Sequence, residues 1–320
     1  MPERVCIVGA GAIGGLFAAH LAQLPELEVW VFDPAREHVD AINQNGLRVT
    51  GATELIGQVN ACTDASEIPD CPLGIIATKG TVTEAAISAT ARIFATGAVC
   101  SVQNGIGNEE VIADHVPRVI RGVTLPAGQV VEPGVIRMNG PGPTWIGPFE
   151  PCPATSDEIE RLAAWLNESG LETRSRADVR GAQWTKLLFN ACTNPLCALT
   201  GLTHGELCDY SPTSDLVDAL LREGIAVAET LGIELEDDPA ELVYSVANAN
   251  YRHRPSMLQD VAARRPTEIA TLNGGVVSAA AEAGVEVPLH RAMVDLIRGV
   301  ERSWDADPER SWDADPEHSE

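Results

Sequence analysis

An apolar segment, a glycine-rich turn and a helix-like segment follow one another at the start of the chain. Residues 4–8 are strand-like, residues 9–15 read Gly-Ala-Gly-Ala-Ile-Gly-Gly, and residues 16–24 are typical of a helix. In such a turn the first glycine permits the tight bend, the second lets the backbone approach a pyrophosphate, and the third lets helix and strand pack closely. The pattern predicts a dinucleotide-binding α/β domain. The residues expected against the cofactor are Gly9, Ala10, Gly11, Ala12, Ile13 and Gly14.

A second strand-like segment, residues 28–32, ends at Asp33, nineteen residues after Gly14. An acidic side chain at this place accepts hydrogen bonds from the adenosine ribose and repels a 2′-phosphate. Asp33 therefore favours NAD(H). Arg36, three residues later, is able to turn toward a 2′-phosphate, so NADP(H) stays an open alternative.

Two further buried-type strands end close to polar residues. Residues 73–78 lead to Lys79, and residues 98–102 lead to Asn104. Ligands of an open α/β sheet bind beyond the carboxyl ends of its strands, so Lys79 and Asn104 are expected side by side at the cofactor. A solvated loop lysine and a plain Asn-Gly turn are the alternatives.

The rest of the chain predicts two domains. Residues 119–147 are β-rich, which predicts antiparallel strands that complete the sheet, and residues 156–170 predict a helix with Ser156 as N-cap. Helical periodicity then dominates residues 178–200, 212–231, 239–252, 267–283 and 288–301. The fold class is therefore α/β, with an N-terminal Rossmann-type domain and an all-helical C-terminal domain. The expected boundaries are 1–176 for the first domain, 177–301 for the second and 302–320 for an acidic tail.

Composition restricts the partners and the compartment. The chain has 46 acidic and 22 basic residues and a formal net charge of −24, whereas nucleic acid and anionic membranes both require a basic surface. No signal-peptide or membrane-spanning segment is recognisable, which favours the cytoplasm. The eight cysteines have no zinc-type spacing, so buried reduced thiols and no metal site are expected.

Only two lysines occur in the chain, Lys79 and Lys186. Unlike arginine, a partly buried lysine can exchange its proton near neutral pH. Lys186, Asn190 and Asn194 have the spacing i, i+4, i+8, which places them on one face of a helix, and Pro195 is expected to kink that helix and expose Asn194 to a ligand. The alternative is a hydrogen-bond network between domains in which the lysine pairs with a carboxylate.

Two further helices are expected to begin in polar residues, one at Ser256 and one with Glu268 in its first turn. Free amides at a helix N-terminus suit a substrate carboxylate. Ser256 is expected to serve as N-cap, as ligand group or as both, and Glu268 is also explained by the helix dipole alone.

In order, the motifs GAGAIG, ATKG, VQNGIG, WTKLLFNACTNPL, SMLQD, RPTEI and LNGGVV resemble the ketopantoate reductase family, over nearly all of residues 4–301. The resemblance implies a cleft between two domains in which a nicotinamide cofactor, by family norm NADP(H), reduces 2-dehydropantoate (ketopantoate) to pantoate, a step toward pantothenate and coenzyme A. It implies Lys186 as proton donor, with Glu268 near the lysine and the cofactor. It also implies Asn190, Asn194 and Ser256 on the substrate, and Gly9 to Gly14, Lys79 and Asn104 on the cofactor.

Three positions depart from the family pattern. His204 replaces a common Asn, Ala270 a common Asp, and Asp33 a residue that is usually basic in NADPH-using members. A same-fold NAD(P)-dependent reductase of another 2-oxo acid or an imine is therefore the first alternative. A dinucleotide sensor without turnover is the second, although a sensor has no need of a proton donor.

The tail repeats itself, since residues 302–309 recur as residues 310–317. We expect no catalytic role for it. The alternative is a contact with a second subunit through Trp304 or Trp312, which would give a homodimer.

Overall fold

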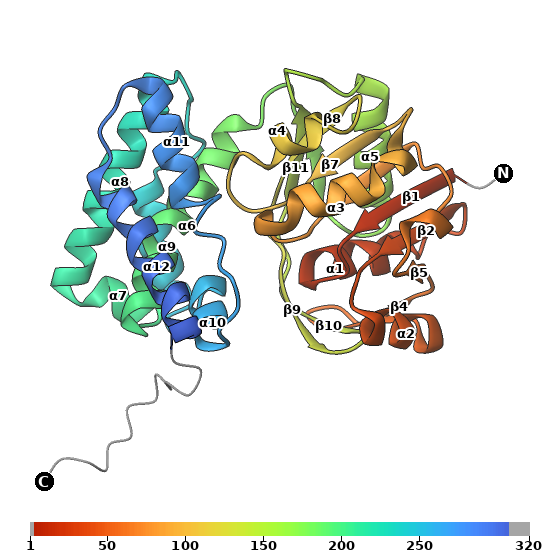
Figure 1. The fold of residues 1–320 in the computed structure, drawn as a ribbon, viewed down its shortest axis with the longest axis horizontal. Coiled ribbons are helices and arrows are strands. Elements are labelled where there is room, and N and C mark those ends of the chain that lie inside the picture. The colour runs from red at the N-terminus through yellow and green to blue at the C-terminus, as the bar shows by residue number, and fades with distance from the viewer. Residues whose placement is uncertain (1–2, 307–320) are drawn as a thin grey trace, which may run out of the picture. The chain divides into compact units, whose positions relative to one another are not determined.

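The computed structural model describes residues 3–306, which comprise an α/β part and a helical part (Figure 1). Their internal contacts divide them into two compact units, with the boundary between Gln183 and Trp184. The predicted fold class is confirmed. Helix α6 (Arg180–Thr200) begins in the first unit and continues in the second.

The main sheet of the first unit has eight strands in the order β12-β11-β8-β7-β6-β1-β2-β5. All neighbours are parallel except β8 and β11. Parallel strands joined by helices produce the sheet expected of a dinucleotide-binding domain. The strands are β1 (Glu3–Val8), β2 (Leu27–Phe32), β5 (Asn60–Cys62), β6 (Leu73–Ile76), β7 (Ala98–Ser101), β8 (Val119–Thr124), β11 (Thr144–Pro148) and β12 (Thr173–Ser175).

A second, four-stranded sheet corrects one prediction. Of the β-rich residues 119–147, only β8 and β11 join the main sheet; the two strands between them pair elsewhere, in the order β4-β3-β10-β9. The reason is packing on α1, because an added Cβ at Gly15 would lie 2.9 Å from Cγ1 of Ile136 in β10. The strands are β3 (Leu47–Gly51), β4 (Leu55–Gly57), β9 (Ala127–Glu132) and β10 (Val135–Gly140).

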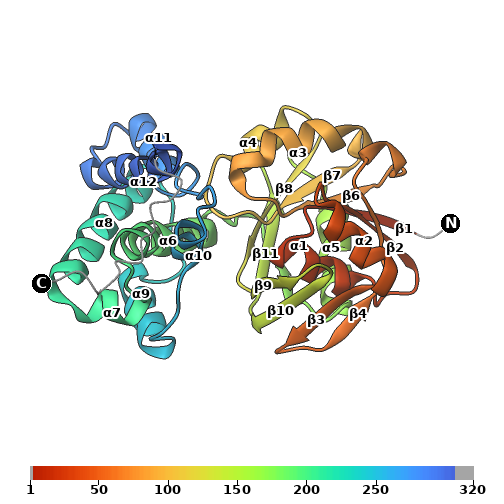
Figure 2. The same ribbon diagram turned by 60° about the horizontal axis from the view of Figure 1, so that its bottom comes forward.

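Helices cover both faces of the main sheet. Figure 2 shows α3 and α4 on one face and α1 and α5 on the other, with the small sheet beyond α1. The side chains of β1 alternate accordingly, with Val5 and Ile7 in one core and Cys6 and Val8 in the other. The helices are α1 (Ala12–Leu21), α2 (Arg36–Asn45), α3 (Thr83–Thr90), α4 (Asn108–Ala113) and α5 (Ser156–Glu168), with short 3-10 turns at Ala65–Glu67, Gly80–Val82 and Ala91–Phe94.

The N-cap of α5 is Thr155, not Ser156 as predicted. The hydroxyl of Thr155 accepts a hydrogen bond from the amide of Glu158 (3.3 Å), and the Glu158 carboxylate accepts one from the amide of Thr155 (2.9 Å). Such a reciprocal pair requires Glu or Gln three residues after the cap, and Ser156 has Ile159 there.

The second unit is helical, and its element bounds correct two predictions. Helix α7 was not predicted, and α11 begins at Asn273 rather than at residue 267. The amide and hydroxyl of Thr267 both donate to Glu301 Oε1 (2.8 and 2.7 Å), and Leu272 has the non-helical angles φ −85° and ψ −96°. After α6 the helices are α7 (His204–Asp209), α8 (Ser211–Thr230), α9 (Pro239–Ala249), α10 (Ser256–Ala262), α11 (Asn273–Ala283) and α12 (Pro288–Ala306).

The tail falls largely outside the described residues. Helix α12 runs to Ala306 and so includes the first five residues of the repeat, with Trp304 among them. Residues 307–320, including Trp312, are not described.

The eight cysteines are all free thiols, six of them buried. Burial is the main cause that raises the pKa of Cys62 to about 11 and of Cys71 to about 12. Between residues 3 and 306, no three His, Cys, Asp or Glu side chains form a group able to hold a metal ion. Within that same stretch, no helix combines the length and apolar character needed to cross a membrane.

Candidate active site

The glycine turn after β1 combines close packing with one open position. Gly9 has φ +94°, and an added Cβ at Gly14 would lie 1.9 Å from the Gly9 carbonyl oxygen, so helix and turn meet too closely for any side chain there. An added Cβ at Gly11 would meet nothing within 4 Å. The open side of Gly11, at the N-terminus of α1, fits a bound pyrophosphate.

The peptide of Ala10, within this turn, is held at both its amide and its carbonyl. Its amide donates to Asp33 Oδ2 (2.8 Å), while Asp33 Oδ1 accepts from the amide of Ala35 (2.9 Å). His38 Nδ1 accepts from the amide of Gly134 (3.0 Å), so His38 Nε2 carries the proton and donates to the Ala10 carbonyl (2.9 Å). Asp33 is thus placed beside the turn, and His38 is a supporting residue that sequence reasoning missed.

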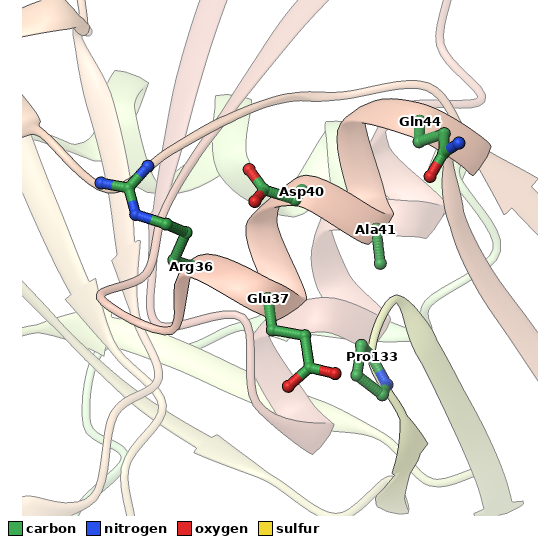
Figure 3. A pocket seen from close by; sticks show the side chains of 6 residues that line it. All are labelled: Arg36, Glu37, Asp40, Ala41, Gln44 and Pro133. Atoms are coloured by element: carbon green, nitrogen blue, oxygen red, sulfur yellow. The ribbon is translucent and has the colours of Figure 1, made fainter.

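Arg36 begins α2 and is exposed. Its guanidinium donates to Thr63 Oγ1 at 3.4 Å. An open depression borders this helix, and Figure 3 shows Arg36 extending away from Glu37, which points toward Pro133. The depression is lined by Arg36, Glu37, Asp40, Ala41, Gln44 and Pro133.

The structure brings together the loops that carry Lys79 and Asn104. They follow the neighbouring strands β6 and β7, and Gln103 joins them by donating to the Thr78 carbonyl (3.0 Å) and to Thr83 Oγ1 (2.8 Å). Asn108 donates to the Asn104 carbonyl at 3.1 Å and accepts from Thr83 Oγ1 at 3.1 Å. A buried network of amides and hydroxyls therefore fixes both loops; its buried side chains are those of Thr83, Gln103 and Asn108.

A second buried group supports the Asn104 loop. Gln183, in the first turn of α6, donates to Glu109 Oε1 (2.8 Å) and to the Gly105 carbonyl (3.3 Å). Burial raises the pKa of Glu109 to about 7, although the charge of Arg121, 3.7 Å away, lowers it. Neither Gln183 nor Glu109 was a sequence candidate, because their partnership spans 74 residues.

The three residues predicted to share one face of α6 are Lys186, Asn190 and Asn194, and we call them the polar stripe. They lie in the second unit. Lys186 and Asn190 are half-buried and Asn194 is 3% exposed. Burial lowers the pKa of Lys186 from 10.5 to about 8, while the charge of Glu268 raises it. Lys186 is therefore mostly an ammonium at neutral pH and is able to release its proton slightly above it.

The remaining predicted site residues lie after α9. Ser256 is exposed and is the first residue of α10, whose N-cap is Pro255, so Ser256 is not the N-cap that was expected. Glu268 is 9% exposed and belongs to the turns before α11, so it is not in a first helical turn. The charge of Glu268 nevertheless raises the pKa of Lys186.

Two of the three departures from the family pattern, His204 and Ala270, have different surroundings. His204 is buried, with ring centroids 5.5 Å from Phe189 and 5.0 Å from His253, and Ala270 is exposed. Burial, assisted by His253, lowers the pKa of His204 to about 4, so this ring is neutral at physiological pH. It packs against the residue next to Asn190.

The first unit has the glycine turn of a dinucleotide site, and the helical unit carries a lysine of lowered pKa. Together these features define a nicotinamide-dependent oxidoreductase. Family models described as "Ketopantoate reductase PanE/ApbA" and "Ketopantoate reductase PanE/ApbA C terminal" match residues 5–151 and 178–301. The chain belongs to the ketopantoate reductase family.

Known relatives are similar over nearly their whole length. A 2-dehydropantoate 2-reductase of Halobacterium salinarum is 32% identical, with 93% of this chain and 99% of the relative covered. The crystal structure of a ketopantoate reductase from Ralstonia eutropha has a TM-score of 0.87 at 31% identity, covering 95% of this chain and 100% of that one. D-mandelate dehydrogenase with NADH and anilino(oxo)acetate has a TM-score of 0.84 at 26% identity, with 95% and 100% covered.

Proposed function

We propose that the protein reduces 2-dehydropantoate to pantoate with a nicotinamide cofactor, a step toward pantothenate and coenzyme A. The observation that carries this proposal is a half-buried lysine with a pKa of about 8 on the same helix face as two asparagines. Several relatives that match 93% of the chain are themselves named 2-dehydropantoate 2-reductase.

The cofactor, when bound, supplies a hydride to the ketone carbon. Negative charge then develops on the ketone oxygen, where the Lys186 ammonium stabilises it and delivers a proton. The Glu268 carboxylate keeps that lysine protonated, because its charge raises the lysine pKa. We assign Asn190, Asn194 and Ser256 to the polar groups of the substrate.

For the cofactor we propose NAD(H), bound by the glycine turn, Lys79 and Asn104. The carboxylate of Asp33 lies against that turn. Among residues 3–306, each of its oxygens accepts a single amide bond, which leaves a lone pair for a ribose hydroxyl. A 2′-phosphate would meet its negative charge. D-mandelate dehydrogenase, of similar fold, binds NADH. NADP(H) is the alternative, with Arg36 as the phosphate ligand.

The first experiment follows nicotinamide absorbance with ketopantoate and either NADH or NADPH, beside a panel of other 2-oxo acids. Turnover of ketopantoate at the highest kcat/KM supports the proposal, and turnover confined to another acid refutes the substrate but keeps the reaction class. Asp33→Ala tests the cofactor: we expect the NADH preference over NADPH to fall at least about tenfold, the effect of removing one close charge repulsion. An unchanged preference would refute the role of Asp33.

A reductase of another 2-oxo acid is the second candidate, favoured by His204. An amide is common in the family at position 204, whereas His204 is a neutral ring whose centroid lies 5.5 Å from that of Phe189, the residue before Asn190. A bulkier acid with an apolar substituent would gain from that contact. The substrate panel distinguishes the two candidates directly. In either case we expect a cytoplasmic enzyme whose ligands are small molecules. A homodimer is an alternative assembly.

A further inference from the structure

The carbonyl of Ala191 lies within α6, between two residues of the polar stripe. In an uninterrupted helix it would accept from the amide of residue 195, but Pro195 has no N–H. The helix nevertheless continues to Thr200. Asn273, the fully buried first residue of α11, donates its Nδ2 to the Ala191 carbonyl at 2.8 Å. A side chain 82 residues away thus replaces the missing backbone donor.

The Asn273 amide is itself held by a second hydrogen bond. Its Nδ2 donates to His290 Nδ1 (3.1 Å), and His290 Nε2 donates to the Leu220 carbonyl (3.0 Å). Within residues 3–306, Asn273 Oδ1 has no hydrogen-bond partner, so the two N–H donors account for the bonds of this side chain. Helices α8, α11 and α12 lie together in both ribbon views (Figures 1 and 2), and this chain of bonds connects them to α6.

The packing around this connection is close. An added Cβ at Gly224 of α8 would lie 2.2 Å from Leu188 Cδ2 of α6 and 3.5 Å from His290 Nε2. The helices therefore approach each other through a glycine, which places His290 close to α6 at Leu188. The position of the Asn273 amide is set by the core of the second unit.

We propose that Asn273 is a positioning residue for substrate binding, which holds the proline-interrupted part of α6 so that Asn190 and Asn194 present their amides at a fixed spacing. This inference rests on the proposed function, in which those two asparagines bind the substrate. Ala191 follows Asn190, and Pro195 follows Asn194. A proline in a helix permits bending, and displacements of about 1 Å in a binding group are enough to reduce catalysis strongly.

A double-mutant cycle tests the proposal with Asn273→Ala, Pro195→Ala and the double variant in the full chain. Alanine at position 195 supplies the backbone N–H, so the Ala191 carbonyl no longer depends on Asn273. We expect Asn273→Ala to raise the KM for the 2-oxo acid at least about tenfold, the equivalent of one lost buried hydrogen bond. The Kd for the cofactor should stay within about twofold, because the glycine cradle belongs to the first unit. In the Pro195→Ala background the same change should raise KM less than about threefold.

Asn248→Ala, an exposed asparagine of α9, is the matched control and should change neither constant. An equal KM increase from Asn273→Ala in both backgrounds would overturn the proposal, since the loss of the His290 bond is common to both. A parallel rise in cofactor Kd would also overturn it, as general destabilisation.

The midpoint of thermal unfolding of the same four proteins gives a readout without substrate. Rescue of stability by Pro195→Ala is expected from the hydrogen-bond replacement, and failure of that rescue contradicts it. If wild type turns over another 2-oxo acid, the KM cycle is run with that acid, so failure of the ketopantoate assignment is separated from failure of the Asn273 assignment.

Discussion

Lys186 is the side chain on which the proposed chemistry depends, and the chain contains only one other lysine. An arginine would stabilise a developing oxyanion but would not release its proton. Burial of Lys186 brings its pKa to about 8, near the working pH at which general acids are most effective.

We expect Lys186→Arg to lower kcat by at least about a hundredfold, the usual contribution of a general acid, and to leave cofactor binding intact. Lys79→Arg is the matched control: its proposed role at the cofactor needs charge alone, so kcat should fall only a few-fold. Steady-state kinetics and cofactor titration by fluorescence measure both. A Lys186→Arg variant with wild-type kcat would contradict the assignment.

The pH dependence follows from the same pKa. Reduction needs the protonated lysine, so kcat/KM should be constant below about pH 8 and fall above it, whereas pantoate oxidation should rise through that range. Because the charge of Glu268 raises this pKa, Glu268→Gln should move the alkaline limb to lower pH. Glu282→Gln, at an exposed position of α11, is the control. If the alkaline limb of the kcat/KM profile stayed at the same pH in both variants, an effect of Glu268 on the Lys186 pKa would be excluded.

Spacing along the chain was enough to predict some candidate site residues and not others. Lys186, Asn190 and Asn194 follow from helical periodicity, and Asp33 follows from its distance to the glycine turn. The supporting residues do not follow, because their partners are remote: His38 bonds Gly134 across 96 residues. A polar residue whose partner lies in another element gives no local signal.

At the scale of elements, two glycines of the same turn have different roles: Gly14 allows close packing, and Gly11 leaves room for the cofactor. Gly14→Ala forces a Cβ to within 1.9 Å of the Gly9 carbonyl and should lower the midpoint of unfolding by several degrees, since overpacking costs about 1–3 kcal/mol. Gly11→Ala meets no protein atom within 4 Å and has φ −61°, which alanine adopts freely. It should leave stability unchanged and weaken cofactor binding at least about tenfold, as a methyl group in the phosphate site would. Thermal scans and cofactor titrations distinguish the two; a Gly11→Ala protein with normal affinity would contradict the cradle.

The helices and strands were predictable where the local sequence alone determines them. Strand β1 and helix α1 follow from local sequence, within a few residues at their ends. Strands β9 and β10 were assigned to the wrong sheet, because β10 pairs with β3, which lies about 90 residues earlier, and this pairing is set by packing on α1. The start of α11 was placed too early because Glu301, in a later helix, binds the Thr267 amide and hydroxyl. Tertiary partners decided both cases.

At the scale of the whole molecule, the net charge of −24 is the main uncompensated feature. Repulsion among the carboxylates favours expansion of the chain, and salt screens it. Raising NaCl from about 0.05 M to about 0.5 M shortens the Debye length from about 14 Å to about 4 Å, so the unfolding midpoint should rise by several degrees. Scans in NaCl and KCl separate screening from ion-specific binding; a midpoint that falls with both salts would show that local ion pairs outweigh the global repulsion.

The division into an α/β and a helical unit was predictable from periodicity, since period-2 and glycine signals give way to helical period after residue 176. The continuity of α6 across the boundary at Gln183 was not predictable, because a compact unit is defined by contacts rather than by the ends of its elements. The first turn of that helix belongs to the first unit through the bonds of Gln183 to the Asn104 loop.

The Ala10 peptide, bonded on one side by Asp33 and on the other by His38, has a consequence for the kinetics of ligand capture. A turn whose backbone is already fixed by folding does not have to be ordered by the ligand, so association loses little conformational entropy. The cofactor should therefore bind the first unit in a single step, with an observed rate in stopped-flow fluorescence that rises linearly with cofactor concentration and does not saturate. His38→Leu, which frees one side of that peptide, should introduce a concentration-independent phase.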